Sequence, residues 1–139
     1  MYSKNHASNI YQNVSIESIV AGANRHELIS ILFKELSTNL TMWQYYFENN
    51  NIAEKGECIN KATKILIGLQ SCLDTETGGD IAFNLYDLYG YCIRTVFRAN
   101  ARNDVSKVIE VKNIISEIQS AWENIPSGFH NMNNTAKAM

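Results

Sequence analysis

The sequence predicts an all-α protein, an antiparallel up-down-up-down four-helix bundle with an N-terminal capping segment. Two observations predict this fold. Apolar residues recur three and four positions apart through four stretches of about 20–25 residues each, which is the spacing of helices with one buried face. The single proline, Pro126, lies near the end of the chain, so these stretches contain no strong helix breaker. Helices of similar length joined by short turns double back on one another, which gives the bundle.

The first helix should begin at Asn24, because Asn24 and Glu27 have the spacing of a capping box. Its apolar stripe consists of Leu28, Ile31, Leu32, Leu36, Leu40, Trp43 and Phe47. The asparagines at 49–51 end this helix, and the second helix follows with Glu54 in its first turn. The stripe of the second helix consists of Cys58, Ala62, Ile65, Leu66, Leu69 and Leu73.

The third helix should begin near Asp80, after the glycines at 78–79, and run to about Ala101. Its inward stripe consists of Ala82, Leu85, Tyr89, Cys92, Ile93 and Val96. A short turn at 102–104 leads to the fourth helix, which Pro126 closes. The fourth stripe consists of Val105, Val108, Lys112, Ile115, Ile118, Trp122 and Ile125. We therefore expect a cap segment at 1–23, the bundle at 24–126 and a flexible polar tail at 127–139.

Charge and composition exclude several classes of protein. The 12 basic and 14 acidic residues give a net charge of -2, without the basic surface of a nucleic-acid binder. No apolar run reaches the ~18 residues of a membrane span, and the N-terminus lacks a secretory signal. We therefore expect a cytoplasmic protein with no nucleic-acid partner and no stable membrane insertion. The three cysteines form no CxxC pair, so we interpret them as small packing residues.

The sequence carries no pattern of catalytic chemistry. It contains no Glu-x-x-His motif of a di-iron bundle and no phosphate-binding glycine loop. The three histidines, His6, His26 and His130, lie near the chain ends or in the first turn of a helix. We therefore predict that the protein is not an enzyme and has no catalytic residue, metal site or cofactor.

The third helix carries more apolar residues than one buried face needs. Twelve of the seventeen positions from Ile81 to Phe97 are apolar or aromatic, whereas one buried face uses roughly three positions in seven. The helix is then either central in the bundle or covered by residues 1–23, or its surplus lines a groove for a partner helix. These interpretations are compatible, because a covering segment can be displaced.

Four motifs, in order, resemble the FliS family of flagellar export chaperones. The first is the tyrosine segment at 11–18, and the second is the segment at 72–89. This second segment contains a Leu-Asp pair, a Gly-Gly turn, Asn-Leu and Leu-Tyr. The third is the turn at 99–104, and the fourth is the pair Ala121-Trp122. Two positions depart from the family, with Asn24-Arg25 in place of Ser-Pro and Leu32-Phe33 in place of Leu-Tyr.

The resemblance implies a cytosolic chaperone that binds the disordered C-terminal segment of flagellin. Such a chaperone prevents premature polymerisation and assists delivery to the flagellar type III export apparatus, and the family also docks on the export-gate protein through the segment of Tyr11. The predicted partner-binding residues are Ile10, Tyr11, Val14, Leu85, Leu88, Tyr89, Ile93 and Phe97. The alternative is a structural or regulatory helical bundle that self-associates through its third helix, and a weak homodimer remains open.

Overall fold

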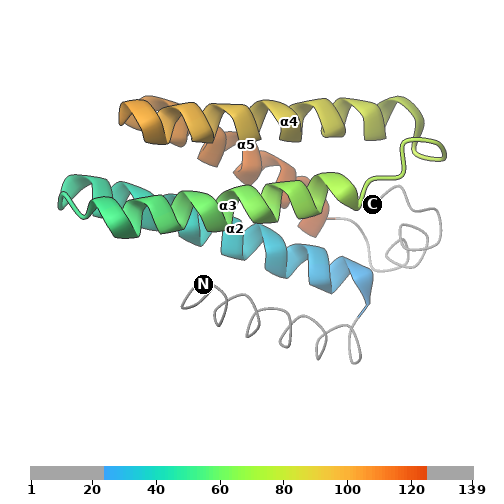
Figure 1. Ribbon diagram of the computed structural model, residues 1–139. Helices are drawn as coiled ribbons and strands as arrows, with labels where there is room; N and C mark the ends of the chain where they lie inside the picture. The colour runs from blue at the N-terminus through green and yellow to red at the C-terminus, as the bar shows by residue number, and fades with distance from the viewer. Residues whose placement is uncertain (1–23, 125–139) are drawn as a thin grey trace.

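The computed structural model describes residues 24–124, which fold into four α-helices joined by short connections (Figure 1). These helices are α2 (Arg25–Glu48), α3 (Ile52–Ser71), α4 (Gly79–Arg102) and α5 (Val105–Glu123). Each helix reverses the direction of the one before it, which confirms the predicted all-α bundle. The predicted cap segment at 1–23 and tail at 127–139 lie outside the described residues.

Polar side chains fix where the helices begin and end. The predicted capping box is present: the Asn24 side chain accepts from the Glu27 N–H at 2.9 Å, and Glu27 accepts from the Asn24 N–H at 3.2 Å. Asp104 caps α5 by accepting from the Lys107 N–H at 3.4 Å. Asn103 ends α4 in the left-handed conformation, at φ 54°, which asparagine tolerates better than most residues.

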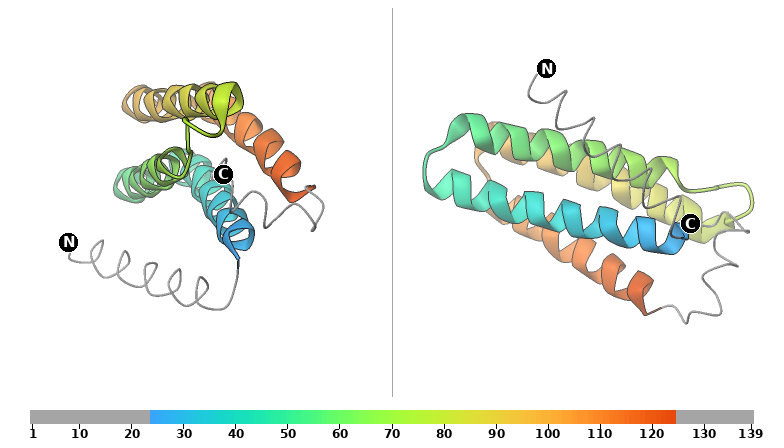
Figure 2. Two further views of the ribbon diagram at one scale, coloured as in Figure 1. Left: turned by 90° about the vertical axis from the view of Figure 1, so that its right-hand side faces the viewer. Right: turned by 90° about the horizontal axis from the view of Figure 1, so that it is seen from below.

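The helices surround one core in the order α2, α3, α4, α5, and α5 returns to α2 (Figure 2). The end of α5 diverges from α4 and lies beside the start of α2, where the His26 ring stacks on the Trp122 indole with centroids 4.6 Å apart. Trp122 Nε1 also donates to the His26 carbonyl at 3.1 Å. This His26–Trp122 contact closes the bundle between residues 96 positions apart.

A buried lysine joins three helices at the opposite end of the bundle. Lys55 Nζ donates to Asn103 Oδ1 at 2.7 Å, to Asn100 Oδ1 at 3.0 Å and to the Asn100 carbonyl at 3.2 Å. Trp43 Nε1 donates to the same Asn100 oxygen at 3.0 Å, and its ring lies 5.3 Å from the ammonium group. Burial lowers the pKa of Lys55. We call these four residues the Lys55 cluster; the sequence did not predict it.

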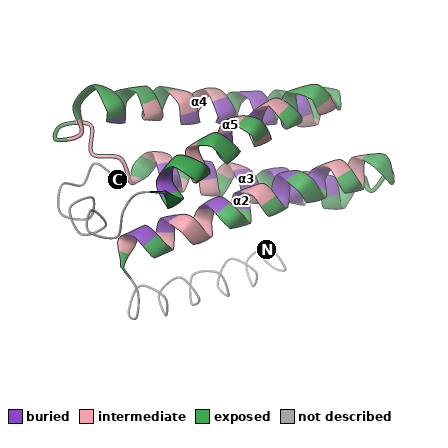
Figure 3. Ribbon diagram, turned by 180° about the vertical axis from the view of Figure 1, so that it is seen from behind, coloured by how far each residue is buried: buried purple, intermediate pink, exposed green. Residues whose placement is uncertain are grey.

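The core lies between the inward sides of the four helices (Figure 3). In α2 the fully buried line runs through Ile29 and Phe33, whereas the predicted Leu28 and Leu32 are only half-buried. The reason is that α2 packs against both α3 and α5, so apolar residues cover several of its faces. In α5, Val111 is buried where the sequence predicted Lys112 in the stripe, and Lys112 instead donates to Gln44 of α2 at 3.0 Å.

The cysteines pack as the sequence predicted. Cys58 and Cys92 are buried and all three thiols are free. Burial raises the pKa of Cys58, and it raises the pKa of Cys92 to about 12. Both thiols therefore stay protonated at neutral pH and unreactive. Within residues 24–124, no three His, Cys, Asp or Glu side chains lie close enough to hold a metal ion. None of the described helices is long and apolar enough to cross a membrane.

Candidate functional site

Helix α4 carries a disproportionate share of the exposed apolar side chains. Nine large apolar side chains are exposed among residues 24–124, and four of them lie on α4. These four are Ile81, Phe83, Tyr86 and Phe97. Phe97 is 69% exposed and Phe83 is 55% exposed. Large exposed apolar patches mark interaction sites, so α4 is the candidate functional helix.

The neighbours of α4 define two flanks on it. Gln70 of α3 donates to the Tyr86 carbonyl at 3.0 Å, and its Nε2 lies 3.4 Å from the position that a Cβ at Gly90 would take. The flank that carries Gly90 therefore faces α3. On the other flank, the Tyr91 hydroxyl donates to Glu110 of α5 at 2.7 Å.

The apolar residues of α4 gather on the flank that faces α3. From Gly90, Ile93 lies three positions away and Phe83 and Phe97 lie seven positions away, so the three side chains share its side of the helix. Tyr86, four positions before Gly90, completes the row. The row itself carries no charge, but the Arg94 guanidinium lies beside it, 3.2 Å from the position that a Cβ at Gly90 would take. The flank can therefore bind a partner mainly by apolar burial.

Helix α3 extends this surface. Gln70 and Lys55 of α3 both reach α4. Ile67 lies three positions before Gln70 and Ile52 lies three positions before Lys55, so both isoleucines lie on the side of α3 near α4. Ile52 is 76% exposed and Ile67 is 47% exposed. We define the α3/α4 face as Ile52, Ile67, Phe83, Tyr86, Ile93 and Phe97. Because α4 has 24 residues, the face follows a helix of roughly 36 Å.

The backbone of α3 is also accessible beside this face. Gly56 lies one turn after Ile52, and, apart from its chain neighbours and the backbone of its own helix, no atom lies within 4 Å of the position that a Cβ at Gly56 would take. A glycine inside a helix costs about 0.5–1 kcal/mol relative to alanine. At Gly56, the missing side chain leaves room for a partner to approach the helix closely.

The structure separates the predicted partner-binding residues of α4. Ile93 is half-buried and Phe97 is exposed, and both belong to the α3/α4 face. Leu85 is half-buried and packs against the core. Leu88 is also half-buried, but it lies seven positions before Thr95, on the flank that faces α5.

Tyr89 is fully buried, and its hydroxyl has no hydrogen-bond partner among the described residues. Burial also raises its pKa. Tyr89 therefore supports α4 from the core, and a direct contact from it to a partner would require the bundle to open. The predicted Ile10, Tyr11 and Val14 lie outside the described residues. The binding role of all these residues stays a prediction.

Sequence reasoning did not single out four members of the α3/α4 face: Ile52, Ile67, Phe83 and Tyr86. For α4 a signal exists in the sequence. Phe83, Tyr86, Gly90, Ile93 and Phe97 follow one another at alternating spacings of three and four, as a second stripe beside the core stripe. For α3 no such signal exists, because isolated isoleucines at the surface are common.

Comparisons with known proteins place the chain in a family. The family model described as "Flagellar protein FliS" matches residues 7–128. The flagellar secretion chaperone FliS of Vibrio cholerae is 38% identical over 122 residues, which cover 88% of this chain and 90% of that protein. The chaperone of the same name in Salmonella typhimurium is 41% identical, covering 83% of this chain and 86% of that protein.

A third relative, the flagellar secretion chaperone FliSB of Pseudomonas aeruginosa, is 42% identical over 115 residues, covering 83% of this chain and 91% of that protein. The matches therefore extend over the whole bundle rather than over one motif. The matched residues 7–128 also include all four motifs of the sequence. The chain belongs to the FliS family of flagellar secretion chaperones.

Proposed function

We propose that this protein binds the C-terminal segment of flagellin in the cytoplasm. By binding it, the protein prevents premature polymerisation and assists delivery to the flagellar type III export apparatus. The observation that carries the proposal is the α3/α4 face, an apolar surface along two neighbouring helices. Family membership supports a flagellar export substrate as the client.

The α3/α4 face suits a client that folds as it binds. An amphipathic helix can lay its apolar side along two parallel ridges of apolar side chains, which is the helix-in-groove mode of recognition. Ordering a disordered segment costs about 2–5 kcal/mol or more. Fully burying one large apolar side chain gives about 1.5–3 kcal/mol, and Phe83, Phe97 and Ile52 each remain more than half exposed before binding. Burial of the whole face can therefore offset the ordering cost.

The chain also contains a candidate for an internal competitor. We propose that residues 1–20 cover the apolar surface when no client is bound, because Ile10, Tyr11 and Val14 would otherwise add unpartnered apolar side chains. In the same proposal, the segment that contains Tyr11 also docks on the export-gate protein. Deleting residues 1–20 should raise the affinity for the client. Unchanged or weaker affinity would contradict the covering role.

The test is a titration with a labelled peptide from the flagellin C-terminus, followed by fluorescence anisotropy. We expect saturable binding that Phe97→Asp weakens about 100-fold, because a contact at the level of a hot spot is lost and a carboxylate enters an apolar interface. Ile109→Asp is the matched control, since Ile109 is exposed on α5 and lies outside the face. Its affinity should match that of the unmodified protein.

Two results would contradict the proposal. One is the absence of saturable peptide binding. The other is equal weakening by Phe97→Asp and Ile109→Asp, which would mean that the α3/α4 face has no special part in binding. Sedimentation of the free protein tests the alternative. A stable dimer that Phe97→Asp dissociates, together with no affinity for flagellin, would identify a self-associating bundle instead.

A further inference from the structure

A pocket of about 230 Å³ lies between the C-terminal half of α4 and the start of α5. It occupies the flank of α4 that faces α5, away from the α3/α4 face. Three basic side chains line it, those of Arg98, Arg102 and Lys107, together with Tyr91 and Asp104. In a chain with a net charge of -2, this is a local concentration of positive charge.

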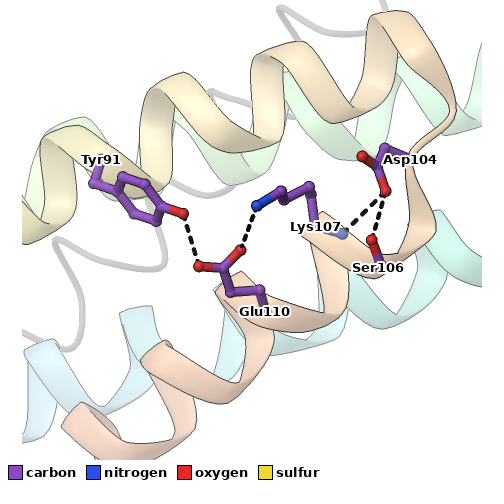
Figure 4. Close-up of polar contacts among 5 residues, drawn as sticks. All are labelled: Tyr91, Asp104, Ser106, Lys107 and Glu110. Carbon is purple, nitrogen blue, oxygen red and sulfur yellow. Dashed lines mark hydrogen bonds and ion pairs between the residues drawn. The ribbon is translucent and has the colours of Figure 1, made fainter.

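The acidic groups at this pocket already have partners (Figure 4). Glu110 accepts from the Tyr91 hydroxyl at 2.7 Å and pairs with Lys107 Nζ at 3.3 Å. Asp104 accepts from the Ser106 hydroxyl at 2.7 Å and from the Lys107 N–H at 3.4 Å. The hydrogen bond from Tyr91 lowers the pKa of Glu110, and the one from Ser106 lowers the pKa of Asp104. Both carboxylates therefore remain ionised and engaged within the protein.

The two arginines, in contrast, have no acidic partner. The ion pair between Lys107 and Glu110 is the only one formed between two side chains of residues 24–124, so Arg98 and Arg102 have no acidic partner among these residues. Both side chains are exposed. They lie four positions apart, which places them about 6 Å apart along the helix axis. A guanidinium group is a planar fork of donors that matches a carboxylate.

We propose that this pocket binds an acidic helical segment of a partner protein, in which two carboxylate side chains one helical turn apart engage Arg98 and Arg102. Lys107 contributes at the edge of the pocket, where Glu110 holds it. The site is separate from the α3/α4 face, so the proposal does not rest on flagellin binding. A client and an acidic partner can occupy α4 at the same time, one on each flank.

The arrangement of the charges favours an acidic polypeptide over other anions. Arg98 and Arg102 leave the helix about 6 Å apart along its axis, a spacing that matches two carboxylates one helical turn apart better than a single phosphate. The carboxylates of Asp104 and Glu110 border the pocket, and they repel a uniformly charged polymer such as a nucleic acid or an anionic membrane. A polypeptide can place neutral side chains opposite these two acids and carboxylates opposite the arginines.

The test uses the full chain and a dye-labelled, alanine-rich peptide of about 15 residues, long enough to form a helix, with glutamates four positions apart. The control peptide has glutamine at each glutamate position. We expect saturable anisotropy changes with the glutamate peptide alone, and weaker binding at higher salt. Arg98→Gln and Arg102→Gln should each weaken binding up to about fivefold, and the double variant about tenfold or more.

Three further variants make the test specific. Lys34→Gln makes the same charge change at an exposed position of α2 and should leave the affinity unchanged. Glu110→Gln removes a negative charge from the border of the pocket, releases Lys107 and should strengthen binding. Phe97→Ser lies on the other flank, adds no charge beside Arg98 and should leave the affinity unchanged, so this proposal and the flagellin proposal can fail separately. Because Arg98 and Arg102 are exposed, circular dichroism should show unchanged folding.

The proposal is overturned when the glutamine peptide binds as tightly as the glutamate peptide. Wild-type affinity in the double arginine variant overturns it as well. The third contrary result is a different ligand: inorganic phosphate, a short single-stranded oligonucleotide or phosphatidylglycerol vesicles that bind through Arg98 and Arg102 more tightly than the peptide does.

Discussion

The two flanks of α4 differ in chemistry although they belong to one helix. The flank toward α3 exposes an apolar row, with Arg94 beside it, and is held to α3 by the buried Lys55 cluster. The flank toward α5 carries arginines and a solvent-accessible network of Tyr91, Lys107 and Glu110. The difference indicates that the bundle interior uses only part of α4. The remaining surface suits two kinds of partner, one bound by apolar burial and one by charge.

The largest expected effect separates the polar contacts on the two flanks. Lys55→Ala should lower the free energy of unfolding by about 2–3 kcal/mol, because three hydrogen bonds and the buried lysine stem are removed, although Asn100 Oδ1 keeps Trp43 as a donor. Lys107→Ala is the control on the other flank, where the ion pair is exposed to solvent and should contribute little. Urea denaturation followed by circular dichroism measures both. Equal losses would remove the distinction between a buried and an exposed lysine.

An effect of intermediate size tests the α3/α4 face with substitutions at two glycines of α3. Gly56→Ala and Gly68→Ala should each raise the free energy of unfolding by about 0.5–1 kcal/mol, since neither added methyl group meets an atom within 4 Å. The two glycines lie on different sides of α3. Gly56 follows Ile52 by one turn on the α4 side, whereas Gly68 precedes Cys72, whose carbonyl accepts from Arg25 of α2.

Only Gly56→Ala should therefore weaken the binding of the flagellin peptide, in a titration with both variants. Gly68→Ala serves as the matched control, because it makes the same change in helix propensity away from the face. Equal affinities in the two variants would mean that the client does not approach the α3 backbone at Gly56.

The smallest expected effect concerns the flank toward α5 at low pH. The hydrogen bond from Tyr91 lowers the pKa of Glu110 below its ordinary value of 4.5. A lowered carboxyl pKa stabilises the fold above pH 4.5, and this contribution is lost as the pH falls through the folded-state value. Tyr91→Phe should therefore lower the melting temperature slightly at pH 7, and the difference should disappear toward pH 2–3 in thermal scans. A difference that persists in acid would indicate lost packing rather than a lost hydrogen bond.

The ends of the helices could be predicted from the sequence because their signals are local. Asn24 and Glu27 form their capping box within one turn, and the asparagines at 49–51 end α2 where expected. The buried line of α2 could not be predicted, because apolar residues cover several of its faces and only packing against α3 and α5 selects Ile29 and Phe33.

The candidate sites were predictable only in part. The surplus of apolar residues on α4 is visible in the sequence, but its division between two flanks depends on which neighbour lies on each side. The Lys55 cluster gives no sequence signal, because Lys55 meets Asn100 and Asn103 across 45 and 48 positions. Arg98 and Arg102 look like ordinary surface residues until the structure places them beside α5 without acidic partners.

The His26–Trp122 contact has a practical consequence for experiments on this protein. It brings the start of α2 and the end of α5 to the same end of the bundle, so the chain enters and leaves the bundle side by side (Figure 1). A fluorophore or surface anchor attached next to Asn24 or Asn124 would sit at that end. The opposite end of the bundle, with the turns at 49–51 and 103–104, would then point away from the surface to which the protein is attached. Ligands could therefore reach both flanks of α4.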